Sequence, residues 1–179
     1  LTEWVPTRAA ALERLADFLP HAAGDYARLR NVDRGPDDRS TVSALSPWIR
    51  RRLLTEEEVI AAVLRRHGFA RAEKFIQEVC WRTYWKGWLE LRPGVWADYQ
   101  TAAARLSAEW ADSAALAAAQ RGQTGIACFD AWAEELVTTG WLHNHTRMWF
   151  ASIWIFTLRL PWELGAAFIQ AQGDAAHAK

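Results

Sequence analysis

Apolar side chains recur along this chain at spacings of three and four residues, the period of an amphipathic helix. The clearest stretch is 129–137, which follows the i, i+3, i+4, i+7, i+8 pattern. Its apolar positions are Phe129, Trp132, Ala133, Leu136 and Val137. The strict alternation of apolar and polar residues that marks a half-buried strand is not found. The pattern therefore predicts an all-α fold.

Capping residues divide this pattern into separate helices. Ser46 as N-cap, followed by Pro47, predicts one helix start. A capping box at Thr55 and Glu58 predicts the next helix, which Gly68 terminates. Further helices are expected over residues 7–19, 26–31, 71–91, 97–121 (one or two helices), 129–137 with Gly140 as C-cap, and 145–160.

A chain of 179 residues suits one domain with a sizeable core. We expect a single helical domain over residues 1–168 and a frayed or truncated tail over 169–179. The N-terminus shows no signal peptide, and the longest apolar stretch, 148–158, is shorter than the roughly 20 residues that span a bilayer. A membrane protein is therefore not expected.

Basic and acidic residues balance at 21 each, which argues against strong non-specific binding to nucleic acid. The two cysteines, Cys80 and Cys128, fit no metal spacing and no paired redox motif. We expect both to be reduced and buried, in a cytoplasmic protein. His143 and His145 lack the further ligands of a metal site, so no metal is expected.

Tryptophan is unusually abundant, with 12 residues. In the stretch 71–91, the residues Glu78, Trp81, Arg82 and Trp85 share one helix face. A carboxylate, a guanidinium and two indoles on one face suit a flat, polar, anionic ligand. The alternative interpretation is a Glu78–Arg82 ion pair along the helix with packed tryptophans beside it.

Two other segments carry polar groups in an apolar setting. Asn144, Arg147 and Met148 share a face of the expected helix 145–160, and an arginine there needs a carboxylate or an anionic ligand as partner. The segment 41–47 places hydroxyls and backbone N–H groups at a helix start, which suits an anion. The alternative role of that segment is ordinary helix capping.

Five sequence blocks, in order, resemble the flavin-binding domain of the cryptochrome/photolyase family. They are Y-x-x-x-R-N at 26–31, S-x-L-S-P at 43–47, E-x-x-W-R at 78–82, G-x-T-G with D-A at 122–131, and T-G-W-x-H-N-x-x-R-M-x-x-A-S at 139–152. Each block alone is weak, but the ordered set is specific and covers most of the chain. The resemblance implies a helical cluster that binds FAD.

The resemblance also assigns roles to individual residues. Phosphate and ribose contacts are implied for Tyr26, Ser43, Leu45 and Ser46. Arg82 is implied as a further contact on the flavin side, and Asn144 and Arg147 as a pair near the flavin ring. Contacts with a flipped, damaged base are implied for Glu78, Trp81 and Met148. Electron-relay tryptophans are implied at Trp162 and, with a looser match, at Trp110.

Three features depart from the family pattern. The N-terminal antenna domain is not expected in this chain, and Ala127 and Cys128 occupy the place of a proline. The segment D-G-D, which in the family supplies a carboxylate partner for the arginine at Arg147, is matched only by residues 172–174. We therefore expect this 179-residue form to retain FAD weakly or not at all.

Two functions follow. The first is an FAD-binding, blue-light-dependent electron-transfer protein, which would act either as a photolyase-like lyase on damaged DNA or in light or redox signalling to a partner protein. The second is a non-catalytic helical scaffold or interaction module that has lost the flavin. The colour of the purified protein distinguishes them, because a flavoprotein is yellow.

Overall fold

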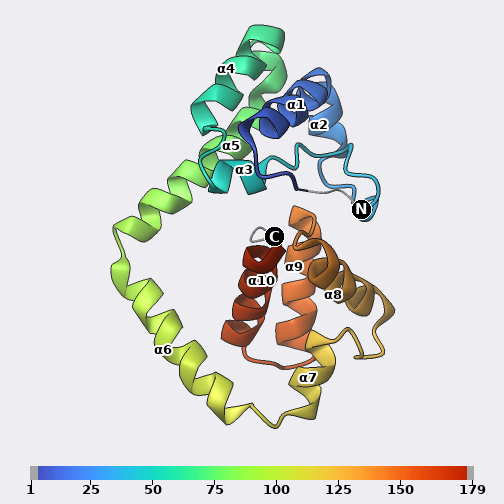
Figure 1. Ribbon diagram of the computed structural model, residues 1–179, viewed down its shortest axis with the longest axis vertical. Coiled ribbons are helices and arrows are strands. Elements are labelled where there is room, and N and C mark those ends of the chain that lie inside the picture. Colours follow the sequence, from blue (N-terminus) through green and yellow to red (C-terminus); the bar gives the residue numbers. More distant parts are fainter. Residues whose placement is uncertain (1–3, 177–179) are drawn as a thin grey trace. The chain divides into compact units, whose positions relative to one another are not determined.

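The computed structural model describes residues 4–176, and side chains as far as Gly173; every regular element in this range is a helix (Figure 1). The first six elements are α1 (Arg8–Phe18), the 3-10 turn η1 (Leu19–His21), α2 (Gly24–Leu29), α3 (Ser46–Arg50), α4 (Glu56–His67) and α5 (Phe69–Glu90). The next six are α6 (Pro93–Glu109), α7 (Ala114–Gln120), α8 (Ala127–Thr139), α9 (Asn144–Ser152), the π-helical turn η2 (Ile153–Thr157) and α10 (Trp162–Ala176). The all-α prediction is confirmed.

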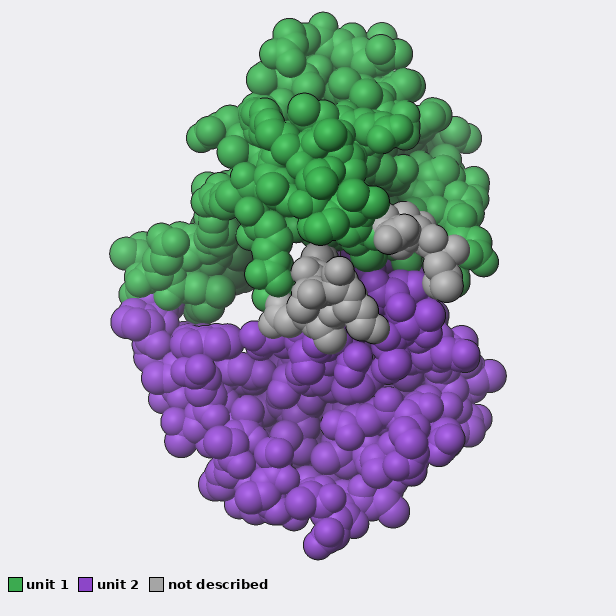
Figure 2. Space-filling model, in the orientation of Figure 1, with its two compact units in different colours: residues 1–91 green, residues 92–179 purple. Residues whose placement is uncertain are grey.

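The chain divides into two compact units, Leu1–Leu91 (unit 1) and Arg92–Lys179 (unit 2), coloured separately in Figure 2. Each unit has a hydrophobic core of its own. The sequence predicts one domain over 1–168 and a frayed tail after it. In the structure, α10 runs from Trp162 to Ala176. No helix within residues 4–176 is both long enough and apolar enough to cross a bilayer.

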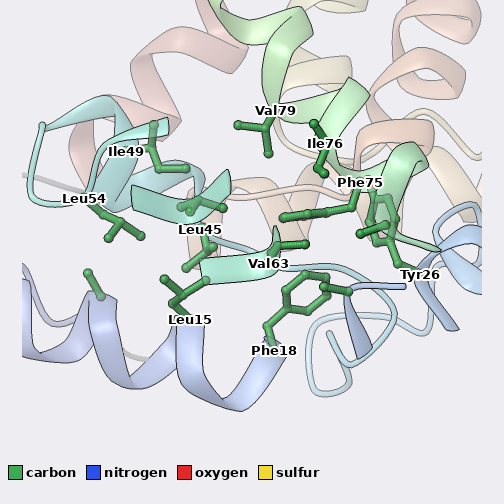
Figure 3. Packing of buried hydrophobic residues seen from close by; sticks show 14 of the residues in the cluster. Leu15, Phe18, Tyr26, Leu45, Ile49, Leu54, Val63, Phe75, Ile76 and Val79 are labelled. Atoms are coloured by element: carbon green, nitrogen blue, oxygen red, sulfur yellow. The ribbon is translucent and has the colours of Figure 1, made fainter. Parts of the chain in front are cut away.

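Three aromatic rings fix how the helices of unit 1 pack (Figure 3). Tyr26 of α2 and Phe75 of α5 have ring centroids 5.0 Å apart, and Phe18 of α1 lies 6.0 Å from Tyr26 and 5.0 Å from Phe75. All three are buried, together with Leu45, which directly precedes α3, and Val59 of α4. This cluster joins α1, α2, α4 and α5 around one point.

Unit 2 is built around stacked aromatic residues from α8, α9, η2 and α10. The rings of Phe129 and Phe150 stack at 4.3 Å, and Trp154 and Phe168 stack at 6.1 Å. Phe150 joins the two pairs, with its centroid 5.9 Å from that of Trp154. Phe129 and Phe150 are fully buried and Trp154 is 1% exposed, so these rings form the centre of the unit.

The caps predicted at Thr55, Gly68 and Gly140 are confirmed, and the one predicted at Ser46 is wrong. Thr55 Oγ1 accepts a hydrogen bond from the Glu58 N–H at 3.3 Å, and the Glu58 carboxylate accepts one from the Thr55 N–H at 2.9 Å. Gly68 follows the end of α4, and Gly140 ends α8 in the left-handed conformation. Ser46 is not the N-cap of α3: Leu45 holds that position, since its carbonyl accepts the first helical hydrogen bond, from Ile49.

Of the one or two helices expected over 97–121, the structure has two, α6 and α7, and Ser113 caps the start of α7. One further sequence prediction needs correction. The cysteines are free, as expected, but both are exposed and not buried. Cys80 follows the buried Val79, and Cys128 precedes the buried Phe129. On a helix, neighbours in sequence point about 100° apart, so each thiol is turned away from the core.

The capping box gives unit 1 a pH dependence. Hydrogen bonds from Arg8 and from the Thr55 backbone lower the pKa of Glu58 from 4.5 to about 2. The stabilisation by ionised Glu58 is therefore present above about pH 4.5 and is lost as the pH falls toward 2. We expect Glu58→Gln to lower the melting temperature at about pH 6 and to have little effect at about pH 2. Glu57→Gln, an exposed neighbour on α4, is the control; an equal shift for Glu58→Gln at both pH values would contradict the prediction.

A close helix contact in unit 2 requires glycine at position 165. A Cβ there would lie 2.9 Å from Nε1 of Trp154, which donates a hydrogen bond to the Pro161 carbonyl at 2.9 Å. Because the indole is buried and held in place, we expect Gly165→Ala to cost about 1–3 kcal/mol, measured by urea denaturation. Gly87→Ala in α5 meets no atom within 4 Å and should be neutral or stabilising. Equal stability of the two variants would refute the close packing.

Candidate functional site

Unit 1 contains a cavity of about 150 Å³ that brings together residues far apart in the sequence. It is lined by Tyr26, Ser43, Leu45, Ser46, Ile49, Val59, Phe75, Glu78, Val79 and Arg82. Every residue of unit 1 for which the sequence predicts a cofactor contact lies in this lining. Glu78, predicted as a substrate contact, lies there as well.

The helix α5 supplies one wall of the cavity because its lining residues share a face. Phe75, Glu78, Val79 and Arg82 stand at i, i+3, i+4 and i+7. Phe75 and Val79 are buried and form an apolar floor, whereas Glu78 and Arg82 carry opposite charges. A ligand in this cavity would meet an apolar base and a charged wall.

A loop with an unusual backbone supplies further lining residues. Ala44, between the lining residues Ser43 and Leu45, has φ of 52°, a conformation that residues other than glycine rarely adopt. The guanidinium of Arg14 on α1 donates to the Ser43 carbonyl at 2.8 Å and to the Val42 carbonyl at 3.1 Å. Arg14 thus holds the loop in place, a role that its sequence position alone does not indicate.

The Arg82 side chain is held by a buried carboxylate. Its Nε lies 3.3 Å from Oε1 of Glu56, in the first turn of α4. Glu56 is 9% exposed and also accepts a hydrogen bond from Arg52 at 3.1 Å. Burial lowers the pKa of Arg82, and the charge of Glu56 opposes this effect. Arginine nevertheless stays cationic at neutral pH, so Arg82 brings a positive charge to the cavity.

Glu78 forms an ion pair with Arg30, the residue that follows α2. The Glu78–Arg82 pair along one helix, considered from sequence, is therefore wrong, because Glu78 pairs with Arg30 and Arg82 with Glu56. Burial, with a smaller effect of the Glu78 charge, raises the pKa of Tyr26 to about 12. The Tyr26 hydroxyl consequently keeps its proton at neutral pH and can donate to a ligand.

Trp81 does not line the cavity. It lies on α5 with 51% of its surface exposed, and its ring is 6.5 Å from that of Trp85 and 5.3 Å from that of Tyr84. The structure therefore separates the roles of two predicted substrate residues. Glu78 lines the cavity. Trp81 instead packs against the exposed rings of Tyr84 and Trp85 on the same helix.

The other predicted ligand residues lie on α9, in unit 2. Asn144 is exposed, as is Met148, which is 61% exposed. Arg147 is half-buried, and its Nε donates to the carbonyl of the buried Leu142 at 3.1 Å. Asn144 and Met148 are thus accessible on the surface of unit 2, while Arg147 is anchored to the chain before the helix.

The predicted relay tryptophans also belong to unit 2. Trp110 ends α6 and packs, half-buried, against the core. Trp162 begins α10, is 52% exposed, and has its ring 5.8 Å from that of Tyr99. Among the described side chains no ring contact links Trp110 to Trp162. Tyr99, which the sequence analysis did not single out, is the aromatic neighbour of Trp162 instead.

The block 122–131 has a structural role. The Asp130 carboxylate accepts hydrogen bonds from the Thr124 and Gly125 N–H groups, each at 2.9 Å. Gly122 has φ of 63°, and a Cβ there would lie 2.7 Å from the Asp130 carbonyl. These contacts shape the turn that precedes α8. Among the described side chains, residues 4–173, histidine, cysteine and carboxylate groups form no cluster suited to a metal ion.

Comparison with known proteins agrees with this architecture. The family model described as the FAD binding domain of DNA photolyase matches residues 75–176, more than half of the chain. The chain therefore belongs to this family of helical domains, whose cofactor is FAD.

Individual relatives are photolyases. The deoxyribodipyrimidine photo-lyase of Vibrio cholerae is 26% identical over 98% of this chain and 38% of its own length. That of a Synechococcus strain is 29% identical over 96% of this chain and 37% of its own. A bacterial class III photolyase from Agrobacterium tumefaciens, solved as a crystal structure, superposes with a TM-score of 0.74 at 26% identity and 98% coverage of this chain. The chain spans less than two fifths of the length of these proteins.

Proposed function

We propose that this chain binds FAD and that the cavity of unit 1 holds the phosphate and ribose part of the cofactor. One observation carries the proposal: Tyr26, Ser43, Leu45, Ser46 and Arg82, assigned to the cofactor by sequence resemblance, line a single cavity. They come from three separate segments of the chain, so their meeting does not follow from sequence proximity.

The chemistry of the cavity fits a phosphorylated sugar. The hydroxyls of Tyr26, Ser43 and Ser46 can donate to phosphate oxygens or accept from ribose hydroxyls. Arg82 supplies a positive charge, and a charged hydrogen bond to phosphate is among the stronger ones that proteins form. The cavity of about 150 Å³ is smaller than the roughly 300–1,000 Å³ of complete ligand sites, so it suits part of a dinucleotide. Asn144 and Arg147 are our proposed contacts for the flavin ring.

For the whole protein we propose a photolyase-type reaction on damaged DNA. Bound FAD would supply light-driven one-electron transfer. Glu78, Trp81 and Met148 are proposed to contact the damaged bases, and Trp110 and Trp162 to carry electrons. The relatives bear the name deoxyribodipyrimidine photo-lyase, which supports this reaction over light signalling to a partner protein and over a scaffold without flavin. A cytoplasmic location stays a prediction of the sequence.

Competition among flavin fragments tests the assigned part of FAD. Cofactor-free protein is titrated with FAD, and bound FAD is then challenged with ADP or with riboflavin. ADP keeps the diphosphate and ribose that the cavity should recognise, whereas riboflavin lacks both. We expect ADP to displace FAD and riboflavin to compete weakly. Displacement by riboflavin but not by ADP would place the recognition elsewhere.

A further inference from the structure

The helix α3 ends in a turn that usually contains glycine. The Leu53 N–H donates to the Trp48 carbonyl at 3.0 Å, and the Arg52 N–H donates to the Ile49 carbonyl at 3.1 Å. These two bonds define a Schellman motif, in which the residue after the C-cap adopts the left-handed conformation. Arg52 occupies that position, with φ of 59°. A residue with a side chain is strained there, so glycine would suit the backbone better.

The side chain of Arg52 bonds to the carboxylate that also holds Arg82. Nη1 of Arg52 donates to Oε2 of Glu56 at 3.1 Å, and the other oxygen, Oε1, lies 3.3 Å from Nε of Arg82. The Glu56 side chain is 11% exposed, whereas those of Arg52 and Arg82 are 61% and 31% exposed. One almost buried carboxylate is therefore shared by two arginines, with one oxygen for each.

The charges around Glu56 act on Arg82 in opposite directions. Burial, the largest effect, lowers the pKa of Arg82; the charge of Glu56 raises it, and the charges of Arg50 and Arg52 lower it. Arg52 and Arg82 together carry twice the charge of the carboxylate between them. Glu56 consequently neutralises Arg82 only in part, and a ligand anion beside Arg82 meets a positive field.

We propose that Arg52 is a positioning residue for the cofactor cavity and acts on Arg82 through Glu56. Arg52 holds one carboxylate oxygen, so that Glu56 contacts Arg82 at Nε with the other. The terminal N–H groups of Arg82 then stay available to an anion in the cavity that Arg82 lines. Without Arg52, both oxygens of Glu56 can turn to Arg82 in the two-bond geometry that a guanidinium and a carboxylate prefer, and so compete with the anion. The inference rests on the proposed function for the identity of this anion, the diphosphate of FAD.

Replacement of Arg52 by glycine is expected to weaken binding without weakening the fold. Glycine removes the strain at this position, so the melting temperature of the cofactor-free protein should stay the same or rise. The dissociation constant for FAD should rise about 2- to 5-fold, the effect of losing a partly exposed ion pair. Arg52→Lys keeps the charge and should bind FAD more nearly as the unmodified protein does. A residue that only stabilised the turn would lower the melting temperature and the affinity together.

Two further variants show whether Arg52 acts through Glu56. Arg51→Gln removes the same charge from the exposed neighbouring residue and should leave both quantities unchanged. In a Glu56→Gln background, Arg52→Gly should have no further effect on FAD affinity, because the carboxylate that links Arg52 to Arg82 is gone. An Arg52→Gly variant that binds FAD as Arg51→Gln does, or that weakens binding equally in both backgrounds, would overturn the proposal.

Inorganic pyrophosphate separates the role of Arg52 from the binding of FAD. It is titrated by calorimetry into the same variants, and its affinity should fall in Arg52→Gly and not in Arg51→Gln. Protein that binds pyrophosphate in this way but does not bind FAD would refute the proposed function and support the role of Arg52. Protein that binds FAD, with equal affinities in the two variants, would refute the role of Arg52 alone. Binding of neither molecule would overturn both.

Discussion

Replacement of Arg82 by alanine is expected to raise the dissociation constant for FAD by about 10- to 150-fold, the equivalent of about 1.5–3 kcal/mol for a charged hydrogen bond. Arg82 is the cation that lines the unit 1 cavity, and Glu56 fixes its position from the neighbouring helix. Arg82→Lys keeps the charge but loses the planar fork of donors, so an intermediate loss is expected. Titration of the cofactor-free protein with FAD gives the dissociation constants of the unmodified protein and of the Arg82→Ala and Arg82→Lys variants.

The matched control is Arg66→Ala, an exposed arginine in the last turn of α4. It removes the same charge from the same unit and should leave FAD affinity unchanged. Thermal melts of each variant separate loss of binding from loss of folding, since Arg82→Ala leaves Glu56 with Arg52 as its remaining ion-pair partner. An Arg82→Ala protein that folds and binds FAD as tightly as the Arg66→Ala protein would show that Arg82 does not touch the cofactor.

Replacement of Phe150 by alanine is expected to destabilise unit 2 by about 3–5 kcal/mol. Its ring is fully buried and lies within 4.3–6.4 Å, between centroids, of Phe129, Trp154 and Phe168. Truncation to alanine leaves a cavity that the three neighbouring rings are too rigid to fill. The loss of unfolding free energy therefore exceeds the part that comes from burying less apolar surface.

Phe156→Ala is the control for this core variant. Phe156 lies six residues further along the chain, in η2, and is 73% exposed, so its removal should change stability by less than about 0.5 kcal/mol. Urea denaturation gives both values. Similar losses for the two variants would contradict the assignment of Phe150 to the core.

The helices could be predicted from sequence because helix formation depends on neighbours a few residues apart. The capping box at Thr55 and the stop at Gly140 are such local signals, and both hold. The sequence predicts Ser46 as the N-cap of α3, one residue later than Leu45, which holds that position without a side-chain hydrogen bond. The sequence does not decide between one and two helices over 97–121, because the alanine-rich stretch favours helix on both sides of Ser113.

The lining of the cavity could be predicted only through the resemblance to a family, not from spacing. Arg30 and Glu78 are 48 residues apart, and Arg14 reaches the loop at Ser43 over 29 residues. No periodic pattern marks such contacts, because they depend on how helices pack. Helical spacing suggested a Glu78–Arg82 pair, and the packing of α2 and α4 against α5 gave each residue a different partner.

Binding of FAD by cofactor-free protein tests the central claim most directly. Equilibrium dialysis against increasing FAD, followed by the absorbance spectrum of the protein and chromatography of the released cofactor, gives the number of sites. We expect weak, reversible binding that saturates only at high FAD concentration, approaches about one FAD per chain and is displaced by ADP. Protein that stays colourless at millimolar FAD, with thermal melts unchanged by the dinucleotide, would contradict the proposal that this domain holds the cofactor of its family.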